Sequence, residues 1–219
     1  MIEDGGRLTV LDAGFPAHWP QLPSLLATIG RTLDDVDAVL LTHAHQDHLG
    51  VAAKIDRPVH IHREEVDAAR HGGWHPNMPA LLASLYRPFF ARYVWHIVAS
   101  GGLRVPPVEA LTAFGDGDVI DVPGRPRVVH APGHTPGTCA LHLDDRKVLF
   151  SGDALVTLDT ATGYVGPSLL TKPFVMDEEQ ARASLARLER VDATIVLPGH
   201  GDPWRGEVRD AVALARNRT

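Results

Sequence analysis

The stretch Thr42-His43-Ala44-His45-Gln46-Asp47-His48 decides how the rest of this 219-residue chain is interpreted. Three imidazoles and one carboxylate, all able to bind a metal, lie within the six residues from His43 to His48. Without a cation, such a group would leave polar atoms unsatisfied or bring like charges together. A borderline divalent metal removes that conflict, and zinc is the usual partner of imidazole with carboxylate. The motif therefore predicts a metal site.

The residues around the motif predict a turn between a strand and a helix. Residues 36–41 form a short apolar run with a β-branched bias, which is typical of a buried strand. Residues 49–55 lack proline and are predicted to be helical. Asp47 would then lie near the N-terminus of the helix, where the helix dipole and the backbone amides favour a carboxylate.

Length and composition predict a single α/β domain over residues 1–219. A chain of 23.7 kDa can bury one sizeable core, and 44% hydrophobic with 22% charged residues is an ordinary globular composition. No apolar run reaches the roughly 18 residues that a membrane span needs. The N-terminal residues are acidic where a signal peptide is basic, and the single cysteine, Cys139, fits a reducing compartment and a place in the core. We expect a cytoplasmic protein that does not bind membranes.

The net charge of -6 and the scattered arginines argue against a dedicated nucleic-acid surface. We expect a small-molecule substrate, no nucleic-acid partner, and a monomer or a homodimer.

Residues 7–14 predict a strand, and Asp4-Gly5-Gly6 predicts a hairpin turn before it. Because a partner strand would lie upstream of that turn, we expect that the usual first strand is absent or that the chain is truncated. The exposed sheet edge would then invite pairing with another subunit.

Three further metal-binding side chains each follow a predicted strand and a turn marked by glycine or proline. His134 follows residues 127–130, Asp153 ends residues 147–153, and His200 follows residues 193–197. The other predicted strands are residues 57–62, 114–122 and 139–143, and the predicted helices are residues 23–29, 64–70, 177–190 and 207–217. A glycine lets the backbone turn sharply while the sheet holds the side chain in place. The pattern therefore predicts one preorganised site.

Residues 74–100 have apolar side chains at helical spacing, with Pro88 expected to break or kink the helix. Two interpretations stay open for this segment. It either covers the core as a pair of helices or forms a cap whose inner face is an apolar wall over the metal site.

Together the motifs resemble those of the metallo-β-lactamase fold superfamily. The matching stretches are residues 42–50, 133–137, 151–153 and 198–201, in the superfamily's usual order, and Asp12 matches its early supporting aspartate. The resemblance covers about residues 7–206. It implies an α/β fold, a four-layered αβ/βα sandwich with the site at one sheet edge, and a helical cap insertion over about residues 74–100.

Carried over residue by residue, the resemblance implies two metal ions. His43, His45 and His134 would bind the first ion, Asp47, His48 and His200 the second, and Asp153 would bridge them. Five histidines and two aspartates exceed the needs of one ion and suit two that share a hydroxide. We expect two Zn(II) per chain, with Mn or Fe as alternatives. Asp12 would brace the ligand loop by hydrogen bonds.

The positive charge of two bound metal ions predicts hydrolysis. A metal lowers the pKa of bound water toward ~7, and two metals ~3.5–4 Å apart can hold hydroxide between them while they polarise a substrate oxygen. We predict that this bridging hydroxide is the nucleophile. Asp47 is the predicted catalytic residue, which orients the nucleophile and assists the leaving group. No serine or cysteine nucleophile is needed.

Differences between this sequence and known subfamilies reduce the range of candidate substrates. Val156 stands where lactonases of the quorum-quenching type carry tyrosine, although Tyr164 from the following loop is a candidate replacement. A glutathione-thioester hydrolase is expected to carry a C-terminal basic substrate site, whereas residues 207–217 of this chain predict a short helix. RNA-processing relatives usually add a basic arm, which the sequence does not indicate. His45 stands where flavin-linked di-iron relatives have glutamate.

The aromatic residues favour a small, partly apolar ester, lactone or related acyl substrate. The candidate pocket residues are Trp19, Trp74, Tyr86, Phe89, Tyr93 and Tyr164. The alternatives are a phosphodiester or phosphotriester hydrolase, a β-lactam hydrolase, and a mononuclear-iron persulfide dioxygenase that would use His43, His45, His134 and Asp153 differently.

Overall fold

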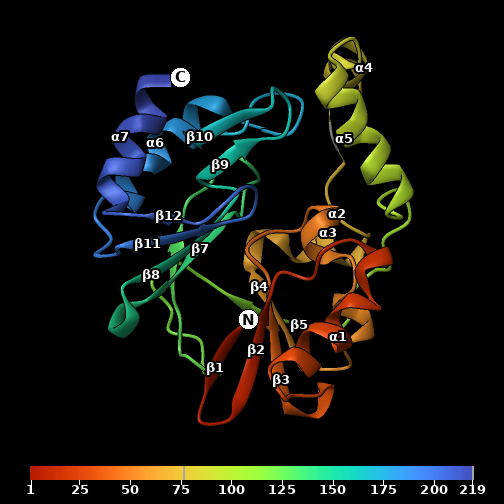
Figure 1. The fold of residues 1–219 in the computed structure, drawn as a ribbon, viewed down its shortest axis with the longest axis vertical. Coiled ribbons are helices and arrows are strands. Elements are labelled where there is room, and N and C mark those ends of the chain that lie inside the picture. Colours follow the sequence, from red (N-terminus) through yellow and green to blue (C-terminus); the bar gives the residue numbers. More distant parts are fainter. Residues whose placement is uncertain (76, 219) are drawn as a thin grey trace. The chain divides into compact units, whose positions relative to one another are not determined.

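The computed structural model describes residues 1–75 and 77–218. The chain, whose elements are labelled in Figure 1, divides into two compact units. Unit 1 comprises Met1–His75, Trp95–Phe114 and Ile120–Arg125, and unit 2 comprises Pro76–Val94, Gly115–Val119 and Pro126–Thr219. Organisation as a single domain stays a prediction.

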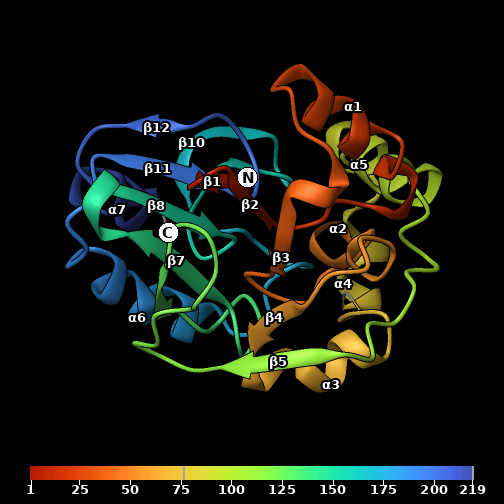
Figure 2. The same ribbon diagram turned by 90° about the horizontal axis from the view of Figure 1, so that it is seen from below.

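A sheet with the strand order β1-β2-β3-β4-β5 forms the centre of unit 1. The strands are Ile2–Asp4, Arg7–Leu11, Val36–Leu40, Val59–His62 and Leu111–Phe114. β1 and β2 pair antiparallel, whereas β2 to β5 are parallel, and Figure 2 shows β3, β4 and β5 in this order. Because parallel strands end at the same edge of a sheet, the segments that follow β2 and β3 begin close together.

Helices pack on this sheet through one buried apolar cluster. They are α1 (Gln21–Thr28), α2 (Gln46–Leu49) and α3 (Val66–Arg70). The 3₁₀ turns of unit 1 include η1 (Pro16–His18), η2 (Leu33–Asp35), η3 (Ala52–Lys54) and η4 (Arg63–Glu65). The cluster joins strand residues such as Val10, Val39 and Ile61 to helical residues such as Leu26, Leu49 and Ala69. Removal of this apolar surface from water, worth about 25 cal/mol per Å², fixes the helices on the sheet.

Unit 2 contains a sheet with the strand order β12-β11-β8-β7-β6. In that order the strands are Trp204–Arg205, Ile195–Pro198, Val148–Gly152, Cys139–Leu143 and Arg127–His130. β8 and β11 are parallel, and the other pairs are antiparallel. β9 (Val156–Asp159) and β10 (Tyr164–Ser168) form a separate hairpin, and η5 spans Asp144–Arg146. Cys139 is fully buried in β7, which confirms it as a core residue.

Helices α6 (Glu178–Leu188) and α7 (Val208–Arg218) pack on the sheet of unit 2 (Figure 1). The Asp177 side chain accepts a hydrogen bond from the backbone N–H of Gln180 at 2.9 Å, so the predicted helix start is confirmed. α4 (Met78–Ser84) and α5 (Pro88–Ala99) show the helical spacing and the break at Pro88 expected for residues 74–100. The boundary between the units falls within α5, after Val94. Within residues 1–75 and 77–218, no helix is both long and apolar enough to cross a membrane.

Several predicted elements are wrong in position. The strand expected at residues 114–122 lies earlier, as β5, and Val119 forms only an isolated bridge with Arg127. Helix 49–55 is instead the short α2 followed by the turn η3. Of the two alternatives expected for the N-terminus, the absence of the usual first strand is wrong, because β1 supplies that partner of β2.

Candidate metal centre

The loop cluster, defined as His43, His45, Asp47 and His48, lies between β3 and the first turns of α2 in unit 1. Its three imidazoles are buried and Asp47 is partly buried. His43 Nε2 lies 3.1 Å from His45 Nδ1, and the ring centroids of His43 and His48 are 4.1 Å apart. Asp47 lies in the first turn of α2, as the motif predicts.

Asp12, directly after β2, orients the loop cluster. Its Oδ1 accepts a hydrogen bond from the Thr42 backbone N–H at 2.9 Å, and its Oδ2 accepts from Thr42 Oγ1 and His48 Nδ1, each at 2.9 Å. Because an ionised carboxylate only accepts, His48 carries its proton on Nδ1 and keeps the lone pair on Nε2. Thr42 Oγ1 also lies 3.0 Å from His43 Nδ1, so one hydrogen-bonded chain orients two imidazoles.

Glu65 is a second brace that the sequence motifs do not reveal. It is fully buried, and its Oε2 accepts hydrogen bonds from the Ala44 backbone N–H at 2.8 Å and from Trp74 Nε1 at 2.6 Å. The Trp74 backbone N–H donates to the Ala44 carbonyl at 2.9 Å. Both backbone groups of Ala44, the residue between His43 and His45, are therefore held. No spacing rule links these three positions in the sequence.

Gly50 allows the loop cluster to approach the end of β2. A Cβ at this position would lie 2.2 Å from the Gly14 carbonyl oxygen, so only glycine fits. The Ala13 N–H donates to the His48 carbonyl at 2.6 Å, and the Val51 N–H donates to the Ala13 carbonyl at 3.2 Å. The glycine of the His-Leu-Gly motif thus has a packing role.

His18 is a further titratable group of unit 1 that the motifs do not single out. Its Nδ1 accepts a hydrogen bond from the Phe15 backbone N–H at 3.2 Å. Burial lowers the pKa of His18, the nearby His96 lowers this pKa further, and the Asp47 charge acts in the opposite direction. Burial therefore favours the neutral form of His18.

The strand-end cluster, defined as His134, Asp153 and His200, follows β6, β8 and β11 of unit 2. Asp153 Oδ2 lies 3.3 Å from His134 Nε2 and 3.3 Å from His200 Nε2. The side chains of His134 and Asp153 are each 2% exposed. β8 and β11 are parallel neighbours with Gly152 opposite Pro198, so the residues that follow them come together. The sheet register brings Asp153 and His200 to one place.

Gly133 fixes the loop that carries His134. Its φ of +130° is a conformation that residues with side chains rarely adopt, and a Cβ would lie 2.1 Å from the backbone nitrogen of Ala181 in α6. The Asp177 N–H donates to the Gly133 carbonyl at 2.8 Å, and the Met176 N–H donates to the His134 carbonyl at 3.2 Å. The start of α6 thereby holds the loop.

Among the candidate pocket residues, Tyr93 of α5 lies beside the strand-end cluster. Its ring makes edge contacts with the His200 ring at a centroid distance of 6.1 Å and with the Phe174 ring at 5.6 Å. The rings of Phe90 and Phe174 are 5.7 Å apart. We call Phe90, Tyr93 and Phe174 the aromatic wall. Sequence reasoning missed Phe174, which lies on a loop without periodicity.

The remaining candidate pocket residues occupy other places. Trp19 and Trp74 are partly buried against the core of unit 1. In unit 2, Tyr86 is exposed and Phe89 lies beside Gly163 in the β9–β10 turn. Tyr164 begins β10, so its predicted place in a loop is wrong, and its ring lies 3.3 Å from the Arg218 guanidinium carbon.

The donor chemistry of both clusters fits a divalent metal of borderline softness. The loop cluster offers imidazoles oriented through their far nitrogens, and the strand-end cluster offers a buried carboxylate between two imidazoles. Nitrogen and carboxylate oxygen together suit zinc, iron or manganese. Each cluster is therefore chemically able to contribute to a metal centre.

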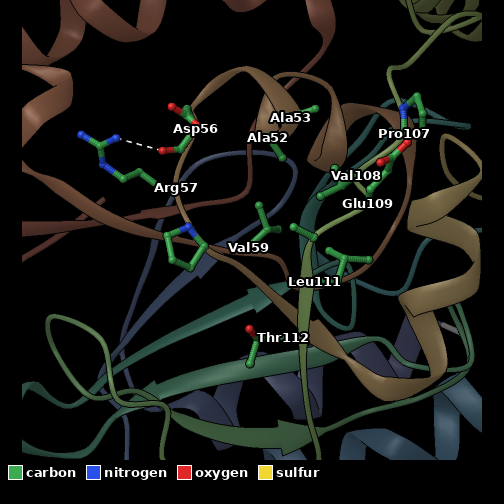
Figure 3. A pocket seen from close by; sticks show the side chains of 12 residues that line it. Ala52, Ala53, Asp56, Arg57, Val59, Pro107, Val108, Glu109, Leu111 and Thr112 are labelled. Atoms are coloured by element: carbon green, nitrogen blue, oxygen red, sulfur yellow. Dashed lines mark hydrogen bonds between the residues drawn. The ribbon is translucent and has the colours of Figure 1, made fainter.

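A separate cavity of about 650 Å³ lies at the N-terminal ends of β4 and β5 (Figure 3). In the parallel part of the sheet this edge is opposite the loop cluster. Arg57 at the cavity donates hydrogen bonds to the carbonyls of Asp56 at 2.9 Å and Val36 at 2.7 Å. Its guanidinium thus supports the local backbone.

Comparison with known proteins identifies the family. The family model described as the metallo-beta-lactamase superfamily matches residues 1–200. The chain belongs to this superfamily. The superfamily's fold binds metal ions, in agreement with the histidine and aspartate clusters of this chain.

Two relatives within the superfamily have names that describe an activity. "Probable metallo-hydrolase YflN" of Bacillus subtilis (strain 168) is 30% identical over 184 residues, which cover 78% of this chain and 66% of the relative. "Acyl-coenzyme A thioesterase MBLAC2" of Homo sapiens is 31% identical over 174 residues, which cover 76% of this chain and 56% of the relative. The chain thus spans 56% to 66% of the length of these superfamily members.

Solved structures of the superfamily confirm the predicted fold class. The metallo-beta-lactamase family protein TTHA1429 from Thermus thermophilus matches with a TM-score of 0.69 and 27% identity, over 99% of this chain and 72% of that chain. TTHA1623, described in a di-iron-bound form, matches with a TM-score of 0.63 and 27% identity, over 93% and 87% of the two chains. The chain therefore has the α/β metallo-β-lactamase fold.

Proposed function

We propose that the protein is a metal-dependent hydrolase that cleaves an acyl bond, such as an ester, lactone or thioester, in a small and partly apolar substrate. The observation that carries the proposal is the pair of buried donor clusters, in which neighbouring groups orient the imidazoles. Membership of the superfamily supports hydrolysis. The acyl-coenzyme A thioesterase relatives support an acyl substrate.

We propose that the loop cluster and the strand-end cluster together hold two zinc ions. His43, His45 and His134 would bind one ion, Asp47, His48 and His200 the other, and Asp153 would be shared. The alternative metal is iron, which is supported by the di-iron-bound form of the similar protein TTHA1623. Bound metal would supply a nucleophile by lowering the pKa of water to ~7 and would polarise the substrate oxygen.

The side chains around the clusters have separate proposed roles. Asp12 and Glu65 hold the imidazoles of the loop cluster in one orientation, which lowers the cost of assembling the site. Asp47 is the proposed catalytic residue, because its partly exposed carboxylate in the first turn of α2 can accept a proton and pass it to the leaving group.

The aromatic wall supports a partly apolar substrate. Tyr93 places its ring edge against His200, and Phe90 and Phe174 pack behind it. This wall would exclude water beside His200 and contact the acyl part of the substrate. A charged group placed against this wall would lose hydration without gaining partners, so the wall suits the acyl part of a substrate.

The decisive experiment is a hydrolysis panel on zinc-loaded protein, with aryl esters, lactones, acyl-coenzyme A thioesters, β-lactams and phosphodiesters. We expect turnover of at least one acyl substrate and two zinc ions per chain by elemental analysis. Turnover of β-lactams or phosphodiesters alone would refute the acyl assignment. One iron per chain with oxygen consumption on a persulfide would identify an oxygenase instead.

The catalytic assignment is tested by single variants. Asp47→Ala and His134→Ala should each lower kcat by at least ~10²-fold, the usual lower range for loss of acid–base or metal chemistry, while circular dichroism shows a retained fold. His200→Ala should leave about one zinc per chain. Asp67→Ala and His71→Ala, on an exposed part of unit 1, are the matched controls and should keep full activity. Wild-type turnover in either test variant contradicts the assignment.

A further inference from the structure

The exposed surface of α4 is almost entirely apolar. The helix has the sequence Met-Pro-Ala-Leu-Leu-Ala-Ser, without a charged side chain, and none of its residues is buried. Leu82 is 61% exposed and Met78 is 52% exposed, and Tyr86, just after the helix, is 77% exposed. A surface helix normally turns its polar face to water, and clustered exposed apolar side chains usually mark an interaction site.

The exposed face of α5 continues this apolar character and adds positive charge. Phe89 and Trp95 are exposed, with Trp95 at 70%. Arg92 lies three residues from each of them along the helix, so the three side chains share one face. Arg87, in the connection between α4 and α5, adds a second guanidinium. We call Met78, Leu82, Tyr86, Arg87, Phe89, Arg92 and Trp95 the α4–α5 surface.

The charge of the surrounding sequence is unlike that of the whole chain. Residues 68–108 contain no aspartate or glutamate, although the chain has 27 acidic residues and a net charge of -6. The same segment contains four arginines, Arg70, Arg87, Arg92 and Arg104. Two of these arginines, Arg87 and Arg92, belong to the α4–α5 surface, and neither α4 nor α5 has an acidic residue, so this apolar surface carries positive charge and favours an anionic partner with an apolar interior.

Although the sequence alone predicts a protein that does not bind membranes, we propose that the α4–α5 surface docks on the surface of an anionic phospholipid bilayer. Tryptophan and tyrosine favour the headgroup level, leucine, methionine and phenylalanine enter the boundary of the acyl chains, and arginine pairs with lipid phosphate. On this surface, Tyr86 and Trp95 are the aromatic residues for the headgroup level, and Leu82 is an apolar residue for the acyl-chain boundary. Arg87 and Arg92 are the arginines that would pair with lipid phosphate. A second copy of this chain fits less well, because a symmetric contact would oppose the arginines of two identical surfaces.

Vesicle co-sedimentation tests this proposal without measuring turnover, so its result is independent of the proposed hydrolase activity. The probes are vesicles of phosphatidylcholine and phosphatidylserine in equal parts, and vesicles of phosphatidylcholine alone. We expect binding to the mixed vesicles that weakens as salt rises, little binding to pure phosphatidylcholine, and a blue shift in the tryptophan emission that is absent in Trp95→Phe.

Two variants separate the apolar and basic contributions. Leu82→Glu with Tyr86→Glu should abolish co-sedimentation, and Arg87→Gln with Arg92→Gln should weaken it about 30-fold, from the usual contribution of two basic residues at an anionic surface. The arginine variant keeps the apolar face, so it decides the test if the glutamate variant fails to fold. Val165→Glu and Arg190→Gln, at exposed positions elsewhere in unit 2, should bind like the wild type.

Three results would overturn the proposal. The first is absence of binding to the mixed vesicles, and the second is unchanged binding in both double variants. The third is a dimer in light scattering that Leu82→Glu with Tyr86→Glu converts to monomer, which would show that this surface joins two copies of the chain.

Discussion

The loop cluster and the strand-end cluster present similar side chains but are held in place by different means. In the loop cluster, the predicted ligands are close in sequence, and distant carboxylates orient them. Asp12 accepts a hydrogen bond from His48, and Glu65 accepts one from the Ala44 backbone N–H. In the strand-end cluster, the predicted ligands are far apart in sequence, and the register of parallel strands and the start of α6 position them. One cluster depends on side chains and the other on backbone.

This difference has energetic consequences. A side-chain brace can be removed while the backbone that it supports stays folded, so its loss should affect metal affinity more than stability. A backbone position that only glycine can occupy cannot be changed without moving the elements packed against it. Substitutions in the two clusters should therefore separate affinity from stability.

Gly133→Ala should have the largest effect. It adds the strain of a positive φ to a Cβ that collides with the backbone of Ala181, for a loss of about 2–5 kcal/mol in the free energy of unfolding together with most of the activity. Denaturant unfolding and kcat measure the two effects. Gly117→Ala is the matched control, because Gly117 in the same unit also has a positive φ but open space around its Cβ position, and it should cost only about 1 kcal/mol. Equal losses in the two variants would show that packing against α6 is unimportant.

Asp12→Asn should have the next largest effect, on metal affinity. Asparagine fits the positive φ of Asp12, but its one carbonyl oxygen cannot replace the two carboxylate oxygens that accept from Thr42 and His48. We expect zinc affinity to fall about 10–100-fold, measured by competition with a chelator, with little change in unfolding. Asp35→Asn removes a carboxylate that accepts from the Thr32 N–H, and it should leave zinc affinity unchanged. An unchanged affinity in Asp12→Asn would mean that the loop cluster needs no side-chain brace.

The difference between local patterns and contacts of distant residues explains how much of the site can be predicted from the sequence. Strand, turn and ligand are adjacent in the chain at His43, His134, Asp153 and His200, so local patterns suffice to place each of them after a strand. Glu65 and Phe174 act through contacts between positions far apart in sequence, which a single sequence does not show.

Elements with weak local signals were also missed. β10 contains Gly166 and Pro167, which normally argue against a strand. The sheet of β9 and β10 has only two strands, so β10 pairs with one neighbour, and the proline, which has no N–H to donate, is tolerated there. β5 is only four residues long and half exposed, so the prediction favoured the more apolar residues that follow it. The cap role of residues 74–100 stays a prediction.

Trp74→Phe should give the smallest effect and test whether Glu65 acts by positioning. The substitution keeps the aromatic packing but removes the indole N–H from Glu65 Oε2, while the Ala44 N–H still holds that oxygen. We expect a loss of about 1 kcal/mol in stability and a fall of a few fold in kcat. Trp204→Phe is the matched control, because the Trp204 indole donates to the Glu207 carbonyl at 3.4 Å in unit 2 and touches no predicted ligand brace. If Trp204→Phe lowers kcat as much as Trp74→Phe does, the Glu65 contact contributes stability alone, and the side-chain bracing of the loop cluster rests on Asp12.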